Sequence, residues 1–545
     1  LLDGAEQPAQ VTPFVPSGPG SMVIVTSNHL LEELVYDGAM PVPVDPLEDE
    51  SATRLLVDIV GRERVEAEPD AVSRLVELCG RLPLALRVCG AHLVGRHRHR
   101  SVAWVVDQIE AADDRLAAIG GSGHHDLAAV FDFAYQALEP AARALYRAIG
   151  LMPSARFAEP AARAVAGLDA DAHAAALAEL VEVSLVRTAD GGRCSVHELA
   201  HRHARITGHR RDGPAAQAQG TRRLLDWYLA ALRAADRAVA PDRLRLAPHG
   251  DPRVEGVPTF TDPKAAFAWF SDERNSIQGV LRLAVDIAWD ERVWHLTEPL
   301  WSFVYNLKSY GLWFEAYEAA ARAGERLGDR SVVARMRSCL ARAYSDHGDF
   351  GRAAQEMAVA EDAVSGVDDT MLRGSIAEFS GIMAFERGDI ADAVAHFQLA
   401  RRLHADAGSD RGAALEQYQL GKCYAAMGSA SKALEAYEAS ERVFVEIGDT
   451  LLATRVMRRR AEALRMAGRD DDAVRAASTA LAASQDLGLP FDEAEALELS
   501  ASLAETMGHA DIARDRLRRA ADIYSHLNHP RARTLLSELG EASGS

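Results

Sequence analysis

The chain of 545 residues has little of several residue types that commonly carry function. Its five cysteines are odd in number, scattered along the chain and form no C-x-x-C pair, which favours a reduced protein. No run of about 18 apolar residues occurs, so the sequence offers no membrane-spanning helix. No charged-then-apolar signal segment stands at its start. We therefore expect a reduced, cytoplasmic setting with no membrane partner.

Basic residues are outnumbered by acidic ones, 60 to 80, and lysine is almost absent. Arginine supplies nearly all of the positive charge, because the four lysines are Lys264, Lys308, Lys422 and Lys432. The formal net charge is −20. A protein that clamps nucleic acid along its whole length normally has a basic face, so this balance argues against that function for the chain as a whole.

What the sequence has instead is a strict repeat of 40 residues. Glycine recurs at this interval, alanine follows five residues later, and a second small residue follows after twelve. The glycines are Gly348, Gly388, Gly428, Gly468 and Gly508; the small residues are Ala353, Ala393, Ala433, Ala473 and Ala513, then Ala360, Ala400, Ser440, Ala480 and Ala520. A fixed period predicts a solenoid whose units bury their apolar faces against their neighbours.

The repeat unit resembles the tetratricopeptide repeat. In residues 417–448, small residues stand at the expected helix crossings, Tyr424 and Tyr437 supply one aromatic to each helix, and Gly428 lies near the turn. The resemblance implies helical hairpins whose first helices form a concave face. Arg455, Arg458, Arg459 and Arg460 lie in one such helix. The favoured interpretation is a solvated charge run, and contact with an acidic partner on the concave face is the alternative.

Four short segments of the N-terminal half carry a second resemblance. Leu1–Ala5 is similar to the end of a Walker B strand, and Val23–Asn28 to the strand that follows it. Cys79–Leu86 is similar to a GLPLAL motif, and Val196–Leu199 to an MHD motif. In this order, ahead of a helical repeat, the segments resemble the NB-ARC nucleotide-binding module of STAND-class signalling proteins.

The stretch Ala268–Asn275 brings the resemblance closest to SARP-type bacterial transcriptional regulators, in which a similar A-x-W-x-x-x-E-R-x-N precedes the repeats. These relatives imply a conformational switch that is biased by ADP or ATP with magnesium and that changes state when the repeats bind a signal. They also imply possible oligomerisation on activation. The implied nucleotide-site residues are Asp3, Thr26, Ser27, Asn28, Pro83, Leu84 and His197. Asp3 would hold a magnesium-bound water, and the relatives imply at most slow ATP hydrolysis by the complete protein.

The sequence departs from this pattern in three places. No G-x-x-x-x-G-K-[ST] occurs, and because the chain opens at Leu1 inside an apolar run, we expect it to lack its natural N-terminus and to bind no nucleotide by itself. Asn28 stands where many relatives carry arginine, and Glu198 replaces the usual aspartate. Each residue also has a structural alternative: Asp3 could cap a strand end, Pro83 start a helix, and His197 satisfy a backbone carbonyl.

Two rival functions involve the same region. Residues 197–201 spell H-E-x-x-H, the zinc-peptidase signature, and a zinc hydrolase remains a remote alternative. A winged-helix block could bind DNA, but the best candidate helix, 171–181, has no lysine or arginine. We expect that DNA is bound only through a missing N-terminal domain. A nucleotide-independent tetratricopeptide scaffold that binds a protein or peptide is the main alternative to the switch.

We therefore predict a mainly α protein: a partial α/β NB-ARC remnant, a helical subdomain, a winged helix and an α-solenoid of tetratricopeptide repeats. The expected domains are 1–48, 49–123, 124–212, a helical connector at 213–330, and the repeat array at 331–545. Within the first domain, residues 22–26 are predicted to form a buried strand, and Val42 and Val44 a short edge strand.

Overall fold

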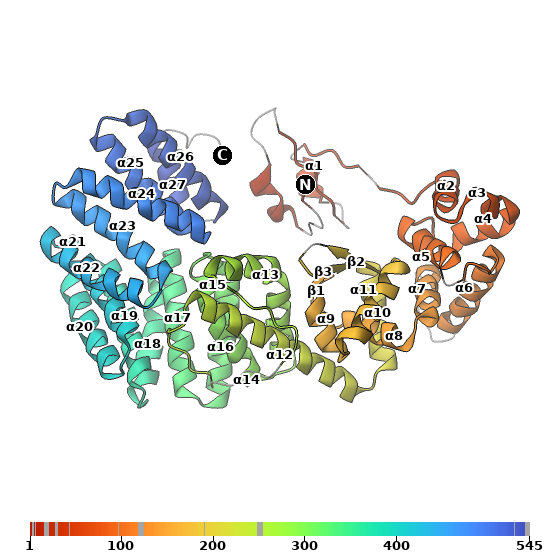
Figure 1. The fold of residues 1–545 in the computed structure, drawn as a ribbon, viewed down its shortest axis with the longest axis horizontal. Coiled ribbons are helices and arrows are strands. Elements are labelled where there is room, and N and C mark those ends of the chain that lie inside the picture. The colour runs from red at the N-terminus through yellow and green to blue at the C-terminus, as the bar shows by residue number, and fades with distance from the viewer. Residues whose placement is uncertain are drawn as a thin grey trace. The chain divides into compact units, whose positions relative to one another are not determined.

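The computed structural model describes the chain except for residues 3–4, 6, 16–20, 28–30, 37, 43, 96, 118–124, 190, 248–253, 528 and 540–545. It divides into two compact units (Figure 1). The first comprises residues 1–138 with 182–184, and the second 139–181 with 185–540. The predicted division into five domains is finer than these units and stays a prediction.

The first unit is a helical subdomain preceded by a segment with little regular structure. Residues 1–48 hold the turns η1 (Pro8–Gln10) and η2 (Thr12–Phe14) and the short helix α1 (Glu32–Tyr36). The subdomain consists of α2 (Asp49–Val60), α3 (Arg62–Ala67), α4 (Pro69–Leu78), α5 (Pro83–Val94), α6 (Val102–Ala117) and α7 (His125–Ala137). Proline at the first position of α4 and α5 suits a helix start, because that N–H has no partner within a helix.

The second unit begins with the predicted winged helix. It comprises α8 (Pro140–Ile149), β1 (Arg156–Ala158), α9 (Glu159–Ala166), α10 (Ala170–Glu182), β2 (Val186–Ala189), β3 (Arg193–Val196) and α11 (Glu198–Arg211). In the described residues β3 lies between the other two strands, and both pairings are antiparallel. Gly191 and Gly192 have positive φ angles at the tip of the predicted hairpin.

A helical connector joins the winged helix to the repeats. Its elements are α12 (Pro214–Val239), α13 (Pro263–Asp286), α14 (Asp290–Thr297), η3 (Glu298–Leu300), α15 (Trp301–Val304) and α16 (Tyr310–Leu327). The long helix α12 buries Trp227 and Tyr228 against the neighbouring helices. Aromatic burial of this kind contributes much of the stability of a helical core.

The repeat array has the predicted period of 40 residues. Its first helices are α17 (Arg330–His347), α19 (Thr370–Glu386), α21 (Asp410–Ala426), α23 (Thr450–Met466) and α25 (Pro490–Thr506). Its second helices are α18 (Phe350–Ser365), α20 (Ile390–Asp406), α22 (Ala430–Glu446), α24 (Asp470–Leu487) and α26 (Ala510–His526), and α27 (Arg531–Glu538) follows. The mainly α fold class with a winged helix and a solenoid is confirmed.

Gly-Asp pairs separate several of these helices. Gly348 adopts φ +92° at the end of α17, where residues other than glycine are strained. The carboxylate of Asp349 then accepts a hydrogen bond from the backbone N–H of Arg352 and caps α18. The same glycine-then-cap order joins α16 to α17 through Asp329, and α22 to α23 through Asp449.

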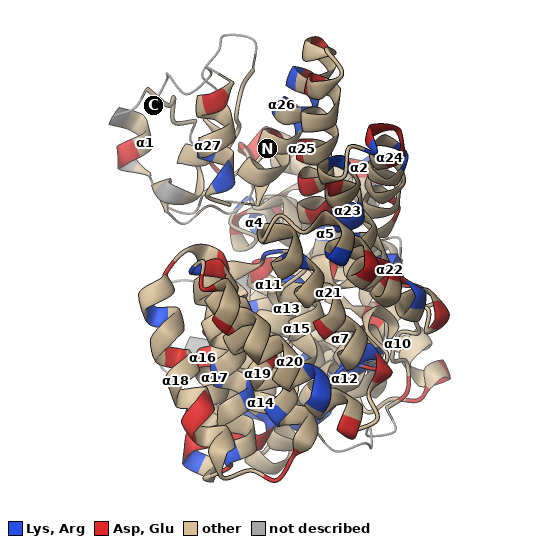
Figure 2. Cartoon of the chain, turned by 90° about the vertical axis from the view of Figure 1, so that its left-hand side faces the viewer, with Lys and Arg blue, Asp and Glu red and all other residues tan. Residues whose placement is uncertain are grey.

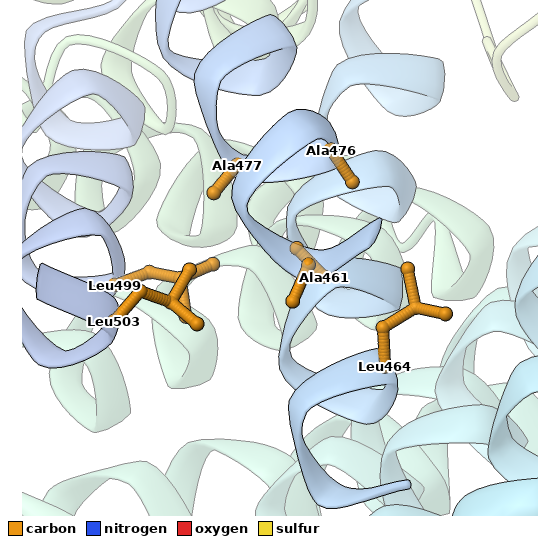
Figure 3. Close-up of a cluster of buried hydrophobic side chains, with 7 residues drawn as sticks. Ala461, Leu464, Ala476, Ala477, Leu499 and Leu503 are labelled. Carbon is orange, nitrogen blue, oxygen red and sulfur yellow. The ribbon is translucent and has the colours of Figure 1, made fainter. Parts of the chain in front are cut away.

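The periodic small residues form the predicted core of the array. Ala473 lies in a cluster with Ala461, Ala476 and Ala477, into which Leu499 and Leu503 of the next repeat also pack (Figure 3). Small side chains at the crossings let neighbouring helices approach, while leucines fill the space that remains. Each repeat therefore buries its apolar face against the next one, as the sequence predicts.

Charge and hydropathy match this organisation. Both signs of charge occur along α22, α24 and α26, the second helices of their repeats (Figure 2). Among the described residues, no helix combines the length and the apolar character that a bilayer crossing demands. The five cysteines are all free and buried.

Candidate functional site

The predicted nucleotide-site residues of the N-terminal segment lie beside a parallel backbone pairing. Leu2 and Val25 form a parallel bridge, and the Thr26 N–H donates to the Leu2 carbonyl at 2.8 Å. The Thr26 carbonyl in turn accepts from the Ala5 N–H at 2.9 Å. Thr26 and Ser27 thus follow directly on this pairing. Asp3 and Asn28 lie outside the described residues.

The prediction of a buried strand at residues 22–26 is wrong. Met22 is 80% exposed and Ile24 52% exposed, and Val25 alone of the described residues in this segment takes part in a bridge. A parallel strand is buried only when other elements cover both faces of its sheet. No strand forms at Val42 and Val44 either; both side chains are exposed, so the predicted edge strand is also wrong.

Pro83 and Leu84 begin α5, as the structural alternative for Pro83 predicts. Pro83 is exposed at the first helical position, and Leu84 is half-buried behind it. The turn before them is fixed from the other side: the Arg81 carbonyl accepts from the Leu47 N–H at 3.1 Å, and its guanidinium pairs with Asp49. The exposed Pro83 and the half-buried Leu84 are held in place at the helix start and can contact a planar ring without rearrangement.

His197 lies between the wing strand β3 and α11, where it caps the helix. Its Nδ1 accepts a hydrogen bond from the Leu199 N–H at 3.2 Å. Partial desolvation and then the Arg187 charge lower the pKa of His197, so the ring is neutral at pH 7. A neutral ring whose Nδ1 accepts carries its proton on Nε2. The exposed side chain can therefore donate one hydrogen bond to an anion.

The H-E-x-x-H pattern does not produce the geometry that a zinc site needs. His201 is buried, and its Nε2 lies 3.1 Å from both the Ile149 and the Met152 carbonyl oxygens. That nitrogen is committed to the protein backbone. Across the part of the chain that the structure describes, no three His, Cys, Asp or Glu residues are grouped as a metal would require.

The stretch Ala268–Asn275 lies in α13, and its glutamate joins the wing to the connector. Glu273 is 1% exposed and forms an ion pair with Arg193 of β3. Its other oxygen accepts from the Tyr228 hydroxyl of α12 at 2.8 Å. One buried carboxylate thus links a strand of the winged helix to two helices of the connector, a role that the sequence pattern alone does not reveal.

The arginine cluster of α23 is paired within the array. Arg455 binds both carboxylate oxygens of Asp492, at 2.7 and 2.8 Å. Arg458 pairs with Glu495 at 2.6 Å, and Arg459 with Glu462 at 2.8 Å. Arg460 pairs with Glu441 of the preceding helix at 2.9 Å. Their role in partner binding stays a prediction, but most of this charge is already neutralised by acids of the array.

A cavity of about 170 Å³ lies between the connector and the first helices of the repeats; we call it the inner cavity. On the connector side, its wall includes residues 239, 240 and 242–244 together with Trp301, Ser302, Tyr305 and Asn306. On the array side, it is lined from α17, α19, α21 and α23 by Arg335, Arg342, Met371, Ser375, Glu378, Phe379, Ile382, Arg411, Leu415, Tyr418, Gln419, Lys422, Leu451, Leu452 and Arg455.

Sequence reasoning missed most of these residues. Arg455 is the member of the α23 cluster that reaches the inner cavity, and most of the other array residues of the wall come from first helices that are 40 residues apart in sequence. Lys422 offered the clearest signal, because lysine is so rare in this chain. The aromatic residues of Trp301–Tyr305 were a second indication of this site, and they lie outside the 40-residue repeat on which the prediction from sequence depends.

Comparison with known proteins adds two close matches in sequence. No family model matches the chain. The "Regulatory protein AfsR" of Streptomyces griseus is 30% identical over 450 residues, which cover 82% of this chain and 45% of that protein. Its counterpart in Streptomyces coelicolor is 29% identical over 469 residues, which cover 83% of this chain and 45% of that protein. The chain spans less than half the length of these relatives.

Solved structures of similar architecture are more distant. A STAND protein with a tetratricopeptide repeat sensor from Pyrococcus horikoshii is 14% identical, with a TM-score of 0.44, over 95% of this chain and 75% of that one. Yeast Tom70 is 13% identical, with a TM-score of 0.36, over 92% of this chain and 93% of that one.

Proposed function

The chain is a homologue of the AfsR regulatory proteins over most of its length, as its motifs predicted, and from this we propose that it is part of a signal-responsive transcriptional regulator of the STAND class. In this proposal, an ADP/ATP-biased switch controls the regulator, and the repeat array is the sensor. The alternative is a scaffold that binds a protein or peptide without nucleotide control.

The nucleotide would be held by the residues whose surroundings fit it. Bound with magnesium, it supplies a charged phosphate chain that can bridge two domains. His197 has a neutral ring with its Nδ1 occupied, which leaves the Nε2 proton for a phosphate oxygen. Pro83 and Leu84 offer apolar surface for the base, and Thr26 and Ser27 follow the parallel bridge. We propose Asp3 and Asn28, outside the described residues, as further contacts.

The observation that carries the switch is the link between the wing and the connector. β3 ends directly before His197, and Arg193 on that strand pairs with the buried Glu273 of α13. The Tyr228 hydroxyl of α12 donates a hydrogen bond to Glu273. Val239, the last residue of α12, lines the inner cavity. A displacement of the array could therefore be passed to the residue proposed to bind phosphate.

The exposed apolar residues of the first segment support the same assignment. Met22, Ile24 and Val44 would be covered if residues 1–48 were part of a parallel sheet in the complete protein. DNA contact is proposed for a region outside this chain, because the candidate helix 171–181 has no lysine or arginine. Activation would permit assembly of several copies.

Titration of fluorescent ADP against the complete gene product tests the switch. We expect saturable binding that weakens at least tenfold in His197→Ala, since a hydrogen bond to a charged group contributes about 1.5–3 kcal/mol. His209→Ala, an exposed histidine of the same helix, is the matched control and should leave affinity unchanged. No ADP binding by the complete protein, or equal binding by His197→Ala, would favour the nucleotide-independent scaffold.

A further inference from the structure

The inner cavity has the size of a small molecule. Its volume is about 170 Å³, and a cavity of roughly 150 Å³ is known to accommodate benzene. An extended peptide or a folded partner needs a longer groove. The space therefore suits a ligand of about one ring with a substituent.

Most of the arginines that line the inner cavity already have acidic partners. Arg342 pairs with Glu386 at 2.8 Å, and Arg411 with Asp449 at 2.8 Å. Arg455 pairs with Asp492 at 2.7 Å. These groups shape the wall, but their charge is largely neutralised inside the protein.

Two cations of the wall differ. Arg335 is 4% exposed, and its guanidinium donates to the Ser375 hydroxyl at 2.9 Å. Lys422 donates to the Gln419 side-chain oxygen at 3.1 Å. Burial lowers the pKa of Lys422 to about 7, so an anion bound beside it would favour its charged form. No carboxylate in the described part of the chain forms an ion pair with either group. A buried guanidinium without an acidic partner costs free energy, which an anionic ligand would recover.

Glu378 lies on α19, between the helices that carry these two cations. It is buried, and the described residues give its carboxyl group neither a hydrogen bond nor an ion pair. Burial raises the pKa of Glu378 to about 7, against the opposing charges of Arg335, Arg411, Arg342 and Lys422. The charges of Arg335 and Lys422 thus both act on the Glu378 carboxyl group. This group can be protonated at neutral pH and can then donate a hydrogen bond.

The aromatic residues of the wall favour an acid over a base. Arg335 lies over the Trp301 ring at 5.7 Å and over the Phe379 ring at 5.9 Å. Lys422 lies over the Tyr418 ring at 5.9 Å. Because the protein's own cations already occupy these ring faces, a cationic ligand would meet like charge instead of a free aromatic cage.

We propose that the inner cavity binds a small organic acid, whose carboxylate is held by Arg335 and Lys422 next to Glu378. The apolar body, about one ring in size, lies against Trp301, Phe379 and Ile382 of the same wall. That this ligand is the signal of the regulator rests on the proposed function; its binding does not.

Calorimetric titration of the 545-residue chain with benzoate, phenylacetate and cyclohexanecarboxylate tests the proposal. We expect at least one acid to bind saturably and at least tenfold more tightly than its neutral amide. Benzamidine, the cationic analogue of benzoate, should not bind. Absence of saturable binding by all three acids, or equal affinity for acid and amide, overturns the proposal.

Substitutions locate the site. Arg335→Gln and Lys422→Gln should each weaken binding of the acid at least tenfold, and because they remove charges without acidic partners, the melting temperature should not fall. Arg352→Gln, an exposed arginine on α18, is the matched control and should bind normally. Unchanged affinity in both cavity variants overturns the assignment; Lys422→Met decides the matter if Arg335→Gln does not fold.

Two further ligands identify the source of the carboxylate. Tighter binding of N-acetylphenylalanine than of any small acid would indicate a peptide terminus and overturn the small-acid assignment. If inorganic phosphate competed with the bound acid as well as the organic acids do, the proposed apolar body would not be needed. The acid titrations contain no nucleotide. Failure of acid binding therefore does not affect the outcome of the ADP experiment, and failure of ADP binding does not affect the proposed acid site.

Discussion

Asp236 is the most constrained acid of the connector. It is fully buried on α12 and accepts hydrogen bonds from three side chains. Arg243 Nε lies at 2.6 Å, Arg245 Nε at 2.7 Å and the Ser302 hydroxyl at 2.6 Å. A single carboxylate thus fixes the loop after α12 and the start of α15, two elements that adjoin the inner cavity.

Asp236→Ala should therefore destabilise the protein strongly. It leaves two guanidinium groups without their acid, and breaking a buried ion pair from one side costs about 3–5 kcal/mol. Urea denaturation followed by tryptophan fluorescence measures the loss. Asp286→Ala, an exposed aspartate at the end of α13, should change the free energy of unfolding by no more than about 0.5 kcal/mol. A loss below about 1 kcal/mol in Asp236→Ala would contradict the role given to this carboxylate.

Glu416 presents the opposite case, a buried acid without a donor. Neither of its carboxylate oxygens has a hydrogen-bond partner. His404 Nδ1 lies 3.5 Å away, but burial lowers the pKa of His404, so this contact is no ion pair at pH 7. Burial, and then the Glu378 charge, raises the pKa of Glu416 well above its ordinary 4.5. The folded chain holds this proton more tightly than the unfolded chain does.

Stability should consequently fall as pH rises from about 4.5 toward the folded-state pKa of Glu416. Glu416→Gln keeps the shape without the titration. At pH 8 we expect it to raise the free energy of unfolding by about 1–3 kcal/mol, because each unit of pKa difference between the folded and unfolded states costs about 1.4 kcal/mol and the amide does not have to bind a proton. The gain should shrink at pH 5. Glu435→Gln, exposed on α22, is the matched control. Destabilisation by Glu416→Gln at pH 8 would show that the carboxylate has a favourable partner.

At the scale of the element, the closest helix approaches depend on glycine. A Cβ built on Gly421 of α21 would lie 2.5 Å from a ring carbon of Tyr437 on α22. Real contacts of this kind are not tolerated, so the ring or the helix would have to move. The absence of a side chain at Gly421 therefore sets how closely the two helices of this repeat pack.

Gly421→Ala should lower the free energy of unfolding by about 1 kcal/mol, because overpacking costs about 1–3 kcal/mol and alanine recovers about 1 kcal/mol of helix propensity. Gly351→Ala tests the same exchange in α18, where the new Cβ would meet nothing nearer than an Asp349 oxygen at 3.7 Å. There we expect stabilisation of up to about 1 kcal/mol. Thermal denaturation of both variants provides the comparison, and equal effects would contradict the packing argument.

The helices of the array could be predicted from sequence because each repeat specifies itself locally. Gly428 ends one helix, Ala433 packs at a crossing, and the same spacing recurs in every repeat. The segment 22–26 could not be predicted in this way, since burial of a strand depends on elements that lie elsewhere. β1 was missed for a related reason: it has three residues and pairs with β3, 37 positions further along at Phe157 and Cys194.

At the scale of the whole chain, the candidate site depends on residues far apart in sequence. Asn306 accepts a hydrogen bond from Arg455 at 2.7 Å across 149 positions. Periodicity places Arg455 in a first helix of a repeat but does not show that the connector covers it. The inner cavity thus forms where the connector contacts the repeat array, and no local sequence pattern predicts that contact.

Because the connector contacts several repeats, contacts in the array are not limited to those between neighbouring repeats. The Lys308 ammonium, bound to Asp346 at 2.9 Å, lies 4.3 Å from the centre of the Phe491 ring on α25. Several repeats separate these two residues in sequence. In a simple solenoid, a change in one repeat is felt only by its neighbours. Here the connector segment 301–309 touches the first helices of distant repeats, so loosening of α25 should be felt in the connector.

Hydrogen exchange on Phe491→Leu tests this coupling. Leucine keeps an apolar side chain near Tyr524 but removes the aromatic face under Lys308, and a cation–π contact contributes about 0.5–1 kcal/mol. We therefore expect amide exchange in residues 301–310 to accelerate about two- to fivefold. Leu536→Ala, which loosens packing at the end of the array without touching Lys308, is the control and should leave that segment unchanged. If both variants leave it unchanged, the repeats behave as nearest neighbours and the connector does not sense the far end of the array.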